Sequence, residues 1–178
     1  HHRQRPPRLR PPGRTHRLTG SRFHRGGVAT GISIRGTFWL MSAANRQVVE
    51  RYWDAHFRRD WDAMATFYDA SCHYTDVGLD PTGATGPEEI VARLRLGIEP
   101  LSGYYHFPRH MVAEGDVVVT EHMEQWRFET GEVIDHPFTS VMEVRGGLIV
   151  RWHDYSHLGN LLDQAPAWWL ERIAAGWR

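Results

Sequence analysis

From Met41 onward, hydrophobic positions recur with the spacing of amphipathic helices. The first predicted helix has Ser42 as its N-cap and one apolar face, formed by Val48, Val49, Tyr52, Trp53, His56 and Phe57. A short second helix is predicted to bury Trp61, Met64, Phe67 and Tyr68. A third helix is predicted to begin at Gly86-Pro87-Glu88-Glu89, with proline at its first position and acids in its first turn, and to end before Pro100. Its inward-facing residues are Ile90, Leu94 and Ile98.

Between the second and third helices, the pattern predicts a short strand over Cys72–Asp76 and a turn over Asp80–Gly83. After Pro100 the period changes to two, which predicts four strands, Tyr104–Val112, Val117–Phe128, Val133–Val144 and Leu148–His157. Glycine-containing pairs separate them as hairpin turns at Gly115-Asp116, Thr130-Gly131 and Gly146-Gly147. A last helix is expected from about Pro166. Helices followed by a meander of antiparallel strands predict an α+β fold with the helices on one face of a curved sheet.

Charge divides the chain unevenly. Residues 1–40 contain nine Arg, four His and no acid, whereas residues 41–178 contain twelve Arg and twenty-one acids, a net charge of −9. The first segment has no periodic apolar pattern that could offset the entropy cost of ordering it. We therefore expect residues 1–40 to be a disordered basic arm lying upstream of the native domain; a functional solvated arm is the alternative. The domain is expected over residues 41–165, with a C-terminal helix over residues 166–178.

Composition narrows the functional classes. Cys72 is the only cysteine, which excludes an intramolecular disulfide and a multi-thiolate zinc site. The histidines lack the spacing of a metal site, and the chain lacks a glycine-rich phosphate loop, so neither a metal nor another cofactor is expected. No apolar run is long enough for a membrane span, and the arm has no secretory hydrophobic region. We expect a cytoplasmic protein that binds neither nucleic acid nor membrane.

Strand alternation brings ionisable and apolar side chains to one face. His122 and Glu124 share a face with Trp126 and Phe128, and Asp154 shares one with Val150 and Trp152, while Tyr74 and Asp76 are co-facial on the short strand. Phe138 on the neighbouring strand completes the expected pocket. Burying an acid is costly unless it is paired or its pKa rises. The pattern therefore predicts an acid/base pocket; in the alternative, Glu124 and Asp154 lie at an open sheet edge and pair with arginines.

The order of elements, together with three motifs, resembles a known superfamily over nearly all of residues 41–165. The motifs are Tyr74-Thr75-Asp76, Glu121-His122-Met123-Glu124 and Val150-Arg151-Trp152-His153-Asp154-Tyr155. They resemble the limonene-epoxide-hydrolase and SnoaL-like branches of the nuclear transport factor two superfamily. The resemblance implies a cone-shaped, cystatin-like fold, in which N-terminal helices pack on a strongly curved, mostly antiparallel sheet that encloses a pocket. It also implies a homodimer.

The resemblance also implies roles for the pocket residues. By analogy with the epoxide hydrolases, Asp154 would be the general base that acts on a water molecule, and Tyr74 would help to hold that water. Asp76 occupies a position where the family has Asn. Glu124 would be the general acid and His122 the bridge between the acids, in place of the family's Asp and Arg. The expected function is a cofactor-independent enzyme for a small apolar molecule, acting by water activation on an epoxide or by cyclase- or isomerase-like proton transfer. The alternative is a non-catalytic binding or dimerisation module of the same fold.

Overall fold

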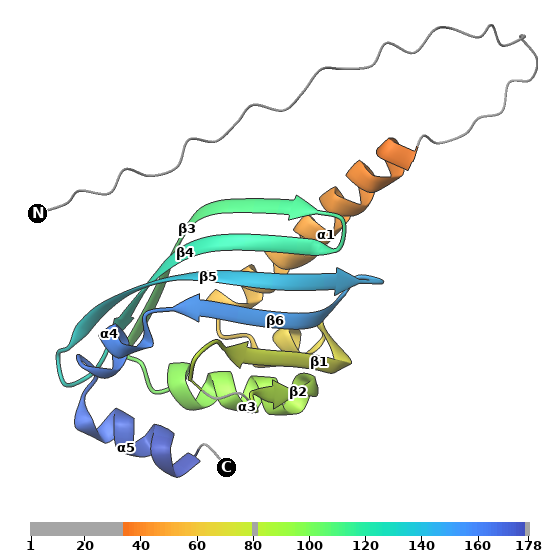
Figure 1. Cartoon of the computed structure of the whole chain (residues 1–178). Coiled ribbons are helices and arrows are strands. Elements are labelled where there is room, and N and C mark those ends of the chain that lie inside the picture. Colours follow the sequence, from red (N-terminus) through yellow and green to blue (C-terminus); the bar gives the residue numbers. More distant parts are fainter. Residues whose placement is uncertain (1–33, 80–81, 177–178) are drawn as a thin grey trace, which may run out of the picture. The chain divides into compact units, whose positions relative to one another are not determined.

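A computed structural model describes residues 34–79 and 82–176, and its first helix is longer than the sequence suggested (Figure 1). Helix α1 spans Ile34–Phe57, so the prediction that Ser42 is its N-cap is wrong. Ser42 lies buried inside the helix, where its hydroxyl accepts a hydrogen bond from the backbone N–H of Gly115 (2.9 Å). Residues 34–40, assigned to the arm from the sequence, are helical. The rest of the predicted arm, and the Asp80-Pro81 part of the predicted turn, lie outside the described residues.

The second helix, α2 (Trp61–Ala65), is shorter than expected and is followed by a turn at Thr66-Phe67. The Asp60 side chain caps it by accepting a hydrogen bond from the backbone N–H of Ala63 (3.1 Å). Tyr68, expected in this helix, instead opens strand β1 (Tyr68–Asp76). A two-residue strand, β2 (Ala84–Thr85), follows and was not predicted. Helix α3 (Gly86–Ile98) has the predicted start, end and buried residues.

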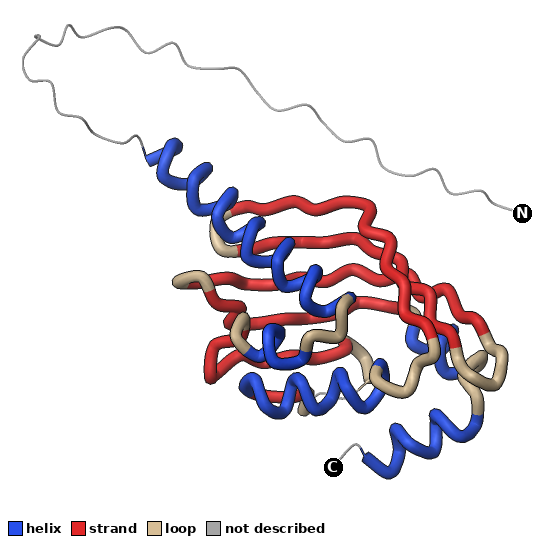
Figure 2. Tube along the Cα trace, turned by 180° about the vertical axis from the view of Figure 1, so that it is seen from behind, coloured by secondary structure: helices blue, strands red, loops and turns tan. Residues whose placement is uncertain are grey.

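The sheet has six strands in the order β2-β1-β6-β5-β4-β3. The predicted meander is confirmed as β3 (Gly103–Glu114), β4 (Val117–Arg127), β5 (Val133–Arg145) and β6 (Leu148–Ser156). These strands pair antiparallel, whereas β1 pairs with β6 in parallel, so the sheet is mixed, and it does not close into a barrel. The long strands curve, and α1 crosses one face of the sheet with α3 beside it (Figures 1 and 2).

Two helices follow the sheet. Helix α4 (Leu158–Leu162) was not predicted; its N-cap is His157, which the sequence had placed in the last strand and whose Nδ1 accepts from the Asn160 backbone N–H (2.9 Å). Helix α5 (Ala167–Gly176) begins close to the predicted Pro166. Within the described ranges, none of the helices combines the length and apolar character needed to cross a bilayer.

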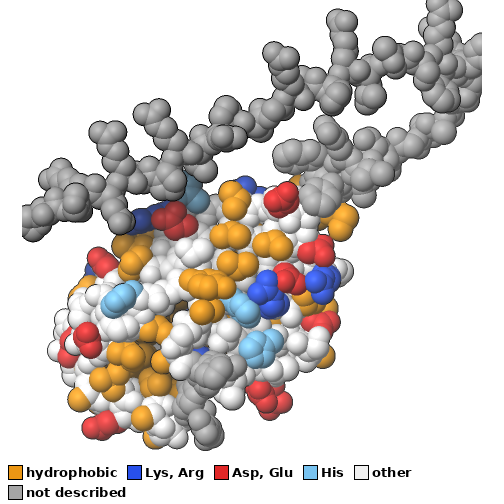
Figure 3. Space-filling view, viewed as in Figure 1, with side chains coloured by type: hydrophobic (Ala, Val, Ile, Leu, Met, Phe, Trp, Pro, Cys, Tyr) orange, Lys and Arg blue, Asp and Glu red, His pale blue; other side chains and the backbone are white. Residues whose placement is uncertain are grey.

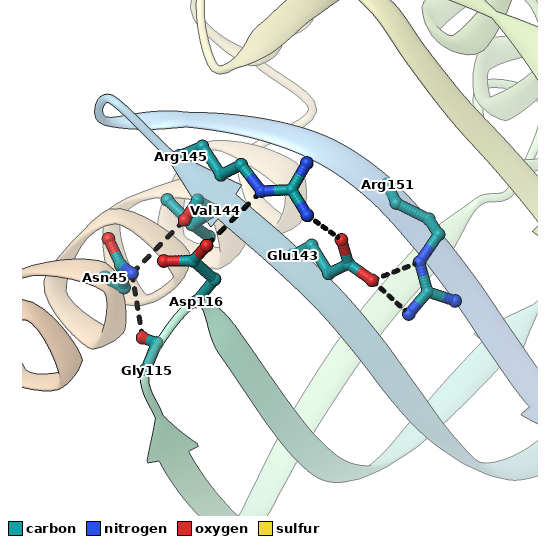
Figure 4. Close-up of polar contacts among 7 residues, drawn as sticks. All are labelled: Asn45, Gly115, Asp116, Glu143, Val144, Arg145 and Arg151. Carbon is teal, nitrogen blue, oxygen red and sulfur yellow. Dashed lines mark hydrogen bonds and ion pairs between the residues drawn. The ribbon is translucent and has the colours of Figure 1, made fainter.

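Polar contacts fix α1 to the ends of two hairpins (Figure 4). The Asn45 side-chain amide donates to the carbonyl oxygens of Gly115 (3.0 Å) and Val144 (3.2 Å). On the neighbouring strands, Glu143 pairs with Arg145 (2.8 Å) and Arg151 (2.5 Å). The buried amide contacts set where the helix lies across the sheet, because each satisfies a backbone carbonyl that would otherwise lose its hydrogen bond.

The other face of the sheet is not covered by the described helices, and apolar side chains gather in its middle (Figure 3). Apolar side chains on this face that are exposed or half-buried include Val112, Val119, Met123, Val141 and Tyr155. The inner face carries the core: the buried positions of β4 and β5 alternate strictly, as the period of two predicted.

Candidate active site

A cavity of about 130 Å³ lies between the helices and the inner face of the sheet. It is similar in size to an engineered apolar cavity that accommodates benzene. Most of its wall is aromatic or aliphatic, including Trp53, Tyr74, Leu94, Ile98, Trp126, Phe138, Trp152, Leu161 and Trp169. Three carboxyl groups also reach it: Asp76, Glu124 and Asp154. The cavity therefore suits a small, mainly apolar molecule that presents one polar group to the acids.

Asp154 is held by neutral donors on one of its two oxygens. Its Oδ1 accepts hydrogen bonds from the Ser140 hydroxyl and from the Trp152 indole N–H. Its Oδ2 has no hydrogen-bond partner in the described part of the chain. Burial, and then the negative charge of Asp76, raise the pKa of Asp154 well above its ordinary value, and the two hydrogen bonds oppose this only in part. Oδ2 is thus free to carry a proton or to accept one.

Glu124 is also buried and is held by neutral donors on both oxygens. Tyr104 donates its hydroxyl hydrogen to Oε1, and the indole N–H of Trp126 donates to Oε2 (2.8 Å). Burial raises the pKa of Glu124 to about 7, against these two hydrogen bonds, which lower it. A carboxyl group that titrates near neutral pH can act as an acid or a base under ordinary conditions.

Asp76 differs from the other two acids because a cation neutralises it. Arg93 of α3 forms an ion pair with Asp76 (2.8 Å), and the Tyr74 hydroxyl donates to the other oxygen of the same carboxylate (2.8 Å). The parallel pairing of β1 with β6 sets Asp76 opposite Asp154 in the sheet. Tyr74 is therefore already bonded to Asp76, whereas the resemblance had implied that it holds a water molecule.

The predicted alternative, acids at an open sheet edge paired with arginines, does not fit the structure. Glu124 and Asp154 are only 5% and 9% exposed, and neither forms an ion pair with any described residue. Seven predicted site residues line one cavity: Tyr74, Asp76, Glu124, Trp126, Phe138, Trp152 and Asp154.

His122 does not occupy the position expected of a bridge between the acids. It is buried on the predicted face, but its Nδ1 contacts Nε2 of His106, and its ring packs against Trp53 (4.4 Å between centroids) and Phe138 (4.9 Å). No hydrogen bond joins it to Glu124 or Asp154 in the described ranges. Burial lowers the pKa of His122 to about 4, so the ring is neutral near pH 7 and cannot replace a permanently charged arginine.

Two residues predicted to line the pocket lie elsewhere. The pairing of β5 with β6 shifts register between Glu143 and Val144, so Ile149 points inward and Val150 is only half-buried. Phe128 follows the end of β4 and packs against the Trp168 and Trp169 rings of α5 (6.0 Å each). Neither is among the described residues that line the cavity.

Besides Ser140, which donates to Asp154, the sequence interpretation missed four polar residues of the site: Arg93, Tyr104, His56 and His136. Arg93 lies three residues after the inward-facing Ile90, which places it on the buried side of α3. His56 was counted among the apolar face of the first helix, but was not given a role. His136 lines the cavity opposite Glu124 in the β4–β5 pairing. Helical and strand periodicity could have marked all four, although not their partners.

Solved structures resemble this fold at low sequence identity. An LEH-like epoxide hydrolase from M. tuberculosis is 20% identical (TM-score 0.60), covering 75% of this chain and 95% of the other. A structure assigned as a SnoaL-like polyketide cyclase from Shewanella putrefaciens is 18% identical (TM-score 0.60; 67% and 94% covered). A hypothetical protein with a ketosteroid isomerase-like fold from Catenulispora acidiphila, in complex with trimethylamine, is 22% identical (TM-score 0.58; 66% and 90% covered). At these identities, the likeness establishes the fold alone.

The sequence comparisons identify the family. A search among curated proteins gives no match. The SnoaL-like domain family, however, matches residues 49–152, which is more than half of the chain. The match and the structural neighbours confirm the resemblance and the fold inferred from the sequence. The chain therefore belongs to the SnoaL-like domain family.

Proposed function

We propose that the protein is a cofactor-independent acid/base enzyme acting on a small, mainly apolar molecule that carries one reactive oxygen. One observation carries this proposal: two buried carboxyl groups, Glu124 and Asp154, face one apolar cavity without a cationic partner among the described residues. Structural acids are normally paired when they are buried. Groups with raised pKa values in a cavity are characteristic of sites that transfer protons.

The two acids act as a pair. Burial disfavours the anion of each acid, and the charge of Glu124 adds to this at Asp154, so we infer that the two together hold a single proton. In that form, one carboxylate accepts a proton while the other carboxyl group donates one. We assign acceptance to Oδ2 of Asp154, following the family's general base, and donation to Glu124. On a ketone, Asp154 would take the hydrogen from the carbon beside the carbonyl, and Glu124 would give its proton to the carbonyl oxygen, which forms the enol.

Proton transfer on carbon fits this site better than water activation. The epoxide hydrolases' pattern needs a tyrosine and an amide to hold water and an arginine between the acids. Here the Tyr74 hydroxyl donates to Asp76, Asp76 pairs with Arg93, and His122 bonds to His106. Epoxide opening remains the second candidate, because an acid and a free carboxylate oxygen are both present.

The test uses ring-sized probes that match the cavity. Cyclohexanone and 2-cyclohexenone are incubated with the protein in D₂O and followed by NMR for deuterium uptake beside the carbonyl; cyclohexene oxide is followed for diol formation. Asp154→Asn keeps the shape but cannot accept a proton, and should lower exchange by roughly 10²–10⁴. Glu121→Gln is the matched control, because Glu121 lies on the same strand and points to the outer face.

Three outcomes decide between the candidates. Deuterium uptake that depends on Asp154 and Glu124 supports carbon-acid chemistry, whereas diol formation alone supports water activation. Binding of the probes without turnover, and with an affinity unchanged in Asp154→Asn, would support the non-catalytic binding module and refute the proposal.

A further inference from the structure

Behind Glu124, a line of buried hydrogen bonds leads away from the cavity. The Tyr68 hydroxyl bonds to that of Tyr52 (2.8 Å), Tyr52 to Nδ1 of His56 (2.9 Å), and Nε2 of His56 to the Tyr104 hydroxyl (3.0 Å). Tyr104 in turn bonds to Oε1 of Glu124. The line therefore joins α1, β1, β3 and β4, and every polar group in it has a partner.

The hydrogen count fixes the direction of this line when Glu124 is ionised. A carboxylate can only accept, so Tyr104 uses its single hydroxyl hydrogen on Glu124. The Tyr104 oxygen must then accept from Nε2–H of His56. A neutral imidazole with its hydrogen on Nε2 has a lone pair on Nδ1, which accepts from Tyr52, and Tyr52 accepts from Tyr68. One assignment satisfies all four bonds, with each hydrogen used once.

The surroundings keep the histidine neutral. Burial, together with the nearby His122, lowers the pKa of His56 to about 3. Burial also keeps the tyrosines protonated by raising their pKa values, and Arg59 opposes this at Tyr104. The other titratable or charged groups that act on this line and on Glu124 are Cys72, Tyr74, Asp76, Asp154, His106 and His136.

We propose that His56 and Tyr104 are positioning residues for Glu124, forming a one-way donor line that keeps the Tyr104 hydroxyl donating to this acid whether or not the acid carries a proton. The proton of Glu124 then never enters the Tyr104 hydrogen bond, so it stays available to the cavity. The inference rests on the proposed function for its catalytic meaning, but the position of the hydrogens can be measured without any substrate.

The experiment is an NMR titration of the ligand-free full chain between pH 5 and 9. Long-range ¹H–¹⁵N spectra report which ring nitrogen of His56 carries hydrogen, with the signal assigned by its loss in His56→Gln. Carboxyl ¹³C shifts report the titration of Glu124, assigned with Glu124→Gln. We expect His56 to remain neutral, with hydrogen on Nε2, throughout this range. We expect Tyr104→Phe to move the Glu124 midpoint up by about one to two pH units, because a hydrogen bond to a carboxylate is lost.

Paired variants separate positioning from packing. His56→Gln retains an N–H that can donate to Tyr104, whereas His56→Leu does not, so only the leucine variant should raise the Glu124 midpoint. Tyr105→Phe is the control, because Tyr105 follows Tyr104 on β3 but is exposed and lies outside the donor line. Hydrogen on Nδ1, a doubly protonated ring, or a tautomer that changes as Glu124 titrates would overturn the inference, even if the variants fail to fold. If only the proposed function is wrong, the His56 tautomer and the Glu124 midpoints will be as expected here, but none of the probes will be turned over.

Discussion

The raised pKa of Glu124 makes the stability of the protein depend on pH in a direction that can be worked out. In the unfolded chain this carboxyl group has an ordinary value of 4.5, whereas burial raises it to about 7 in the folded protein. Between these two values, the folded state binds a proton that the unfolded state does not. The free energy of unfolding therefore receives its full contribution from Glu124 below pH 4.5 and loses it as the pH rises through 7.

The size of this loss follows from the two pKa values. Each pH unit of difference corresponds to about 1.4 kcal/mol, so the contribution of Glu124 falls by about 3 kcal/mol between pH 4.5 and 7. Glu124→Gln removes the ionisation but keeps a side chain of the same shape. Its absolute stability also reflects altered hydrogen bonds with Tyr104 and Trp126. The ionisation of Glu124 is therefore measured by the difference in unfolding free energy between wild type and variant, and by how that difference changes with pH.

Urea denaturation of wild type and Glu124→Gln at pH 5 and pH 8 measures that change. We expect the variant to gain about 3 kcal/mol relative to wild type as the pH rises. Glu121→Gln, on the same strand but facing outward, should show no comparable gain. A difference between wild type and Glu124→Gln that stays constant with pH would mean that the pKa of Glu124 is not raised by folding, and would count against a proton-transferring site.

Three further predictions test other parts of the structure. The pKa of His56 is lowered from 6.5 to about 3, so the unfolded chain binds a proton in this range that the folded protein does not. The contribution of His56 to the free energy of unfolding is therefore fully present above pH 6.5 and falls by about 5 kcal/mol as the pH drops to 3. In urea titrations, the stability difference between wild type and His56→Gln should shrink from pH 7 to pH 4. Asn45→Ala leaves two buried carbonyl oxygens without their donor and should cost about 1–3 kcal/mol in the same assay, whereas the exposed Arg46→Ala should cost much less. We also propose that the apolar outer face of the sheet mediates a homodimer; light scattering after gel filtration should show two chains for wild type and one for Val141→Glu, and a monomeric wild type would refute this.

Alternation along the strands was the most informative sequence signal, and its failures have local causes. It correctly placed Glu124, Trp126 and Asp154 on the inner face, because side chains of a regular strand must alternate. It failed at Val150, since the register shift between β5 and β6 reverses the faces there. The residues at this position carry no glycine or other mark that distinguishes the shift from a regular strand.

His122 shows a different limit of the same signal. Its face was predicted correctly, but a face does not state which end of the sheet a residue occupies. Two residues along a strand are a displacement of about 7 Å, which is enough to separate His122 from the carboxyl groups and place it beside His106. The role taken from the family's motif assumed a bridge that this geometry does not form.

Residues that act on the acids through hydrogen bonds could not be identified from sequence, because their partners come from distant segments. Tyr104 and Glu124 are twenty positions apart, and His56 reaches Tyr104 across forty-eight. Local propensity also does not show where α1 begins. Ser42 is a residue type that favours N-caps, but its hydroxyl instead accepts a hydrogen bond from the backbone N–H of Gly115. Such assignments depend on how the helix lies across the sheet.

The departures from the epoxide-hydrolase pattern have a common physical effect on the acids. A bridging arginine would favour the ionised form of both, because a nearby cation lowers the pKa of a carboxyl group. In this chain, Arg93 pairs with Asp76, while neutral donors hold the other two acids: Tyr104 and Trp126 on Glu124, and Ser140 and Trp152 on Asp154. Neutral donors orient a carboxyl group without keeping it charged. Glu124 can therefore exchange a proton near neutral pH, and the pKa of Asp154 is raised in the same direction. A permanently charged bridge would lower both pKa values and so oppose the proton transfer on carbon that we propose.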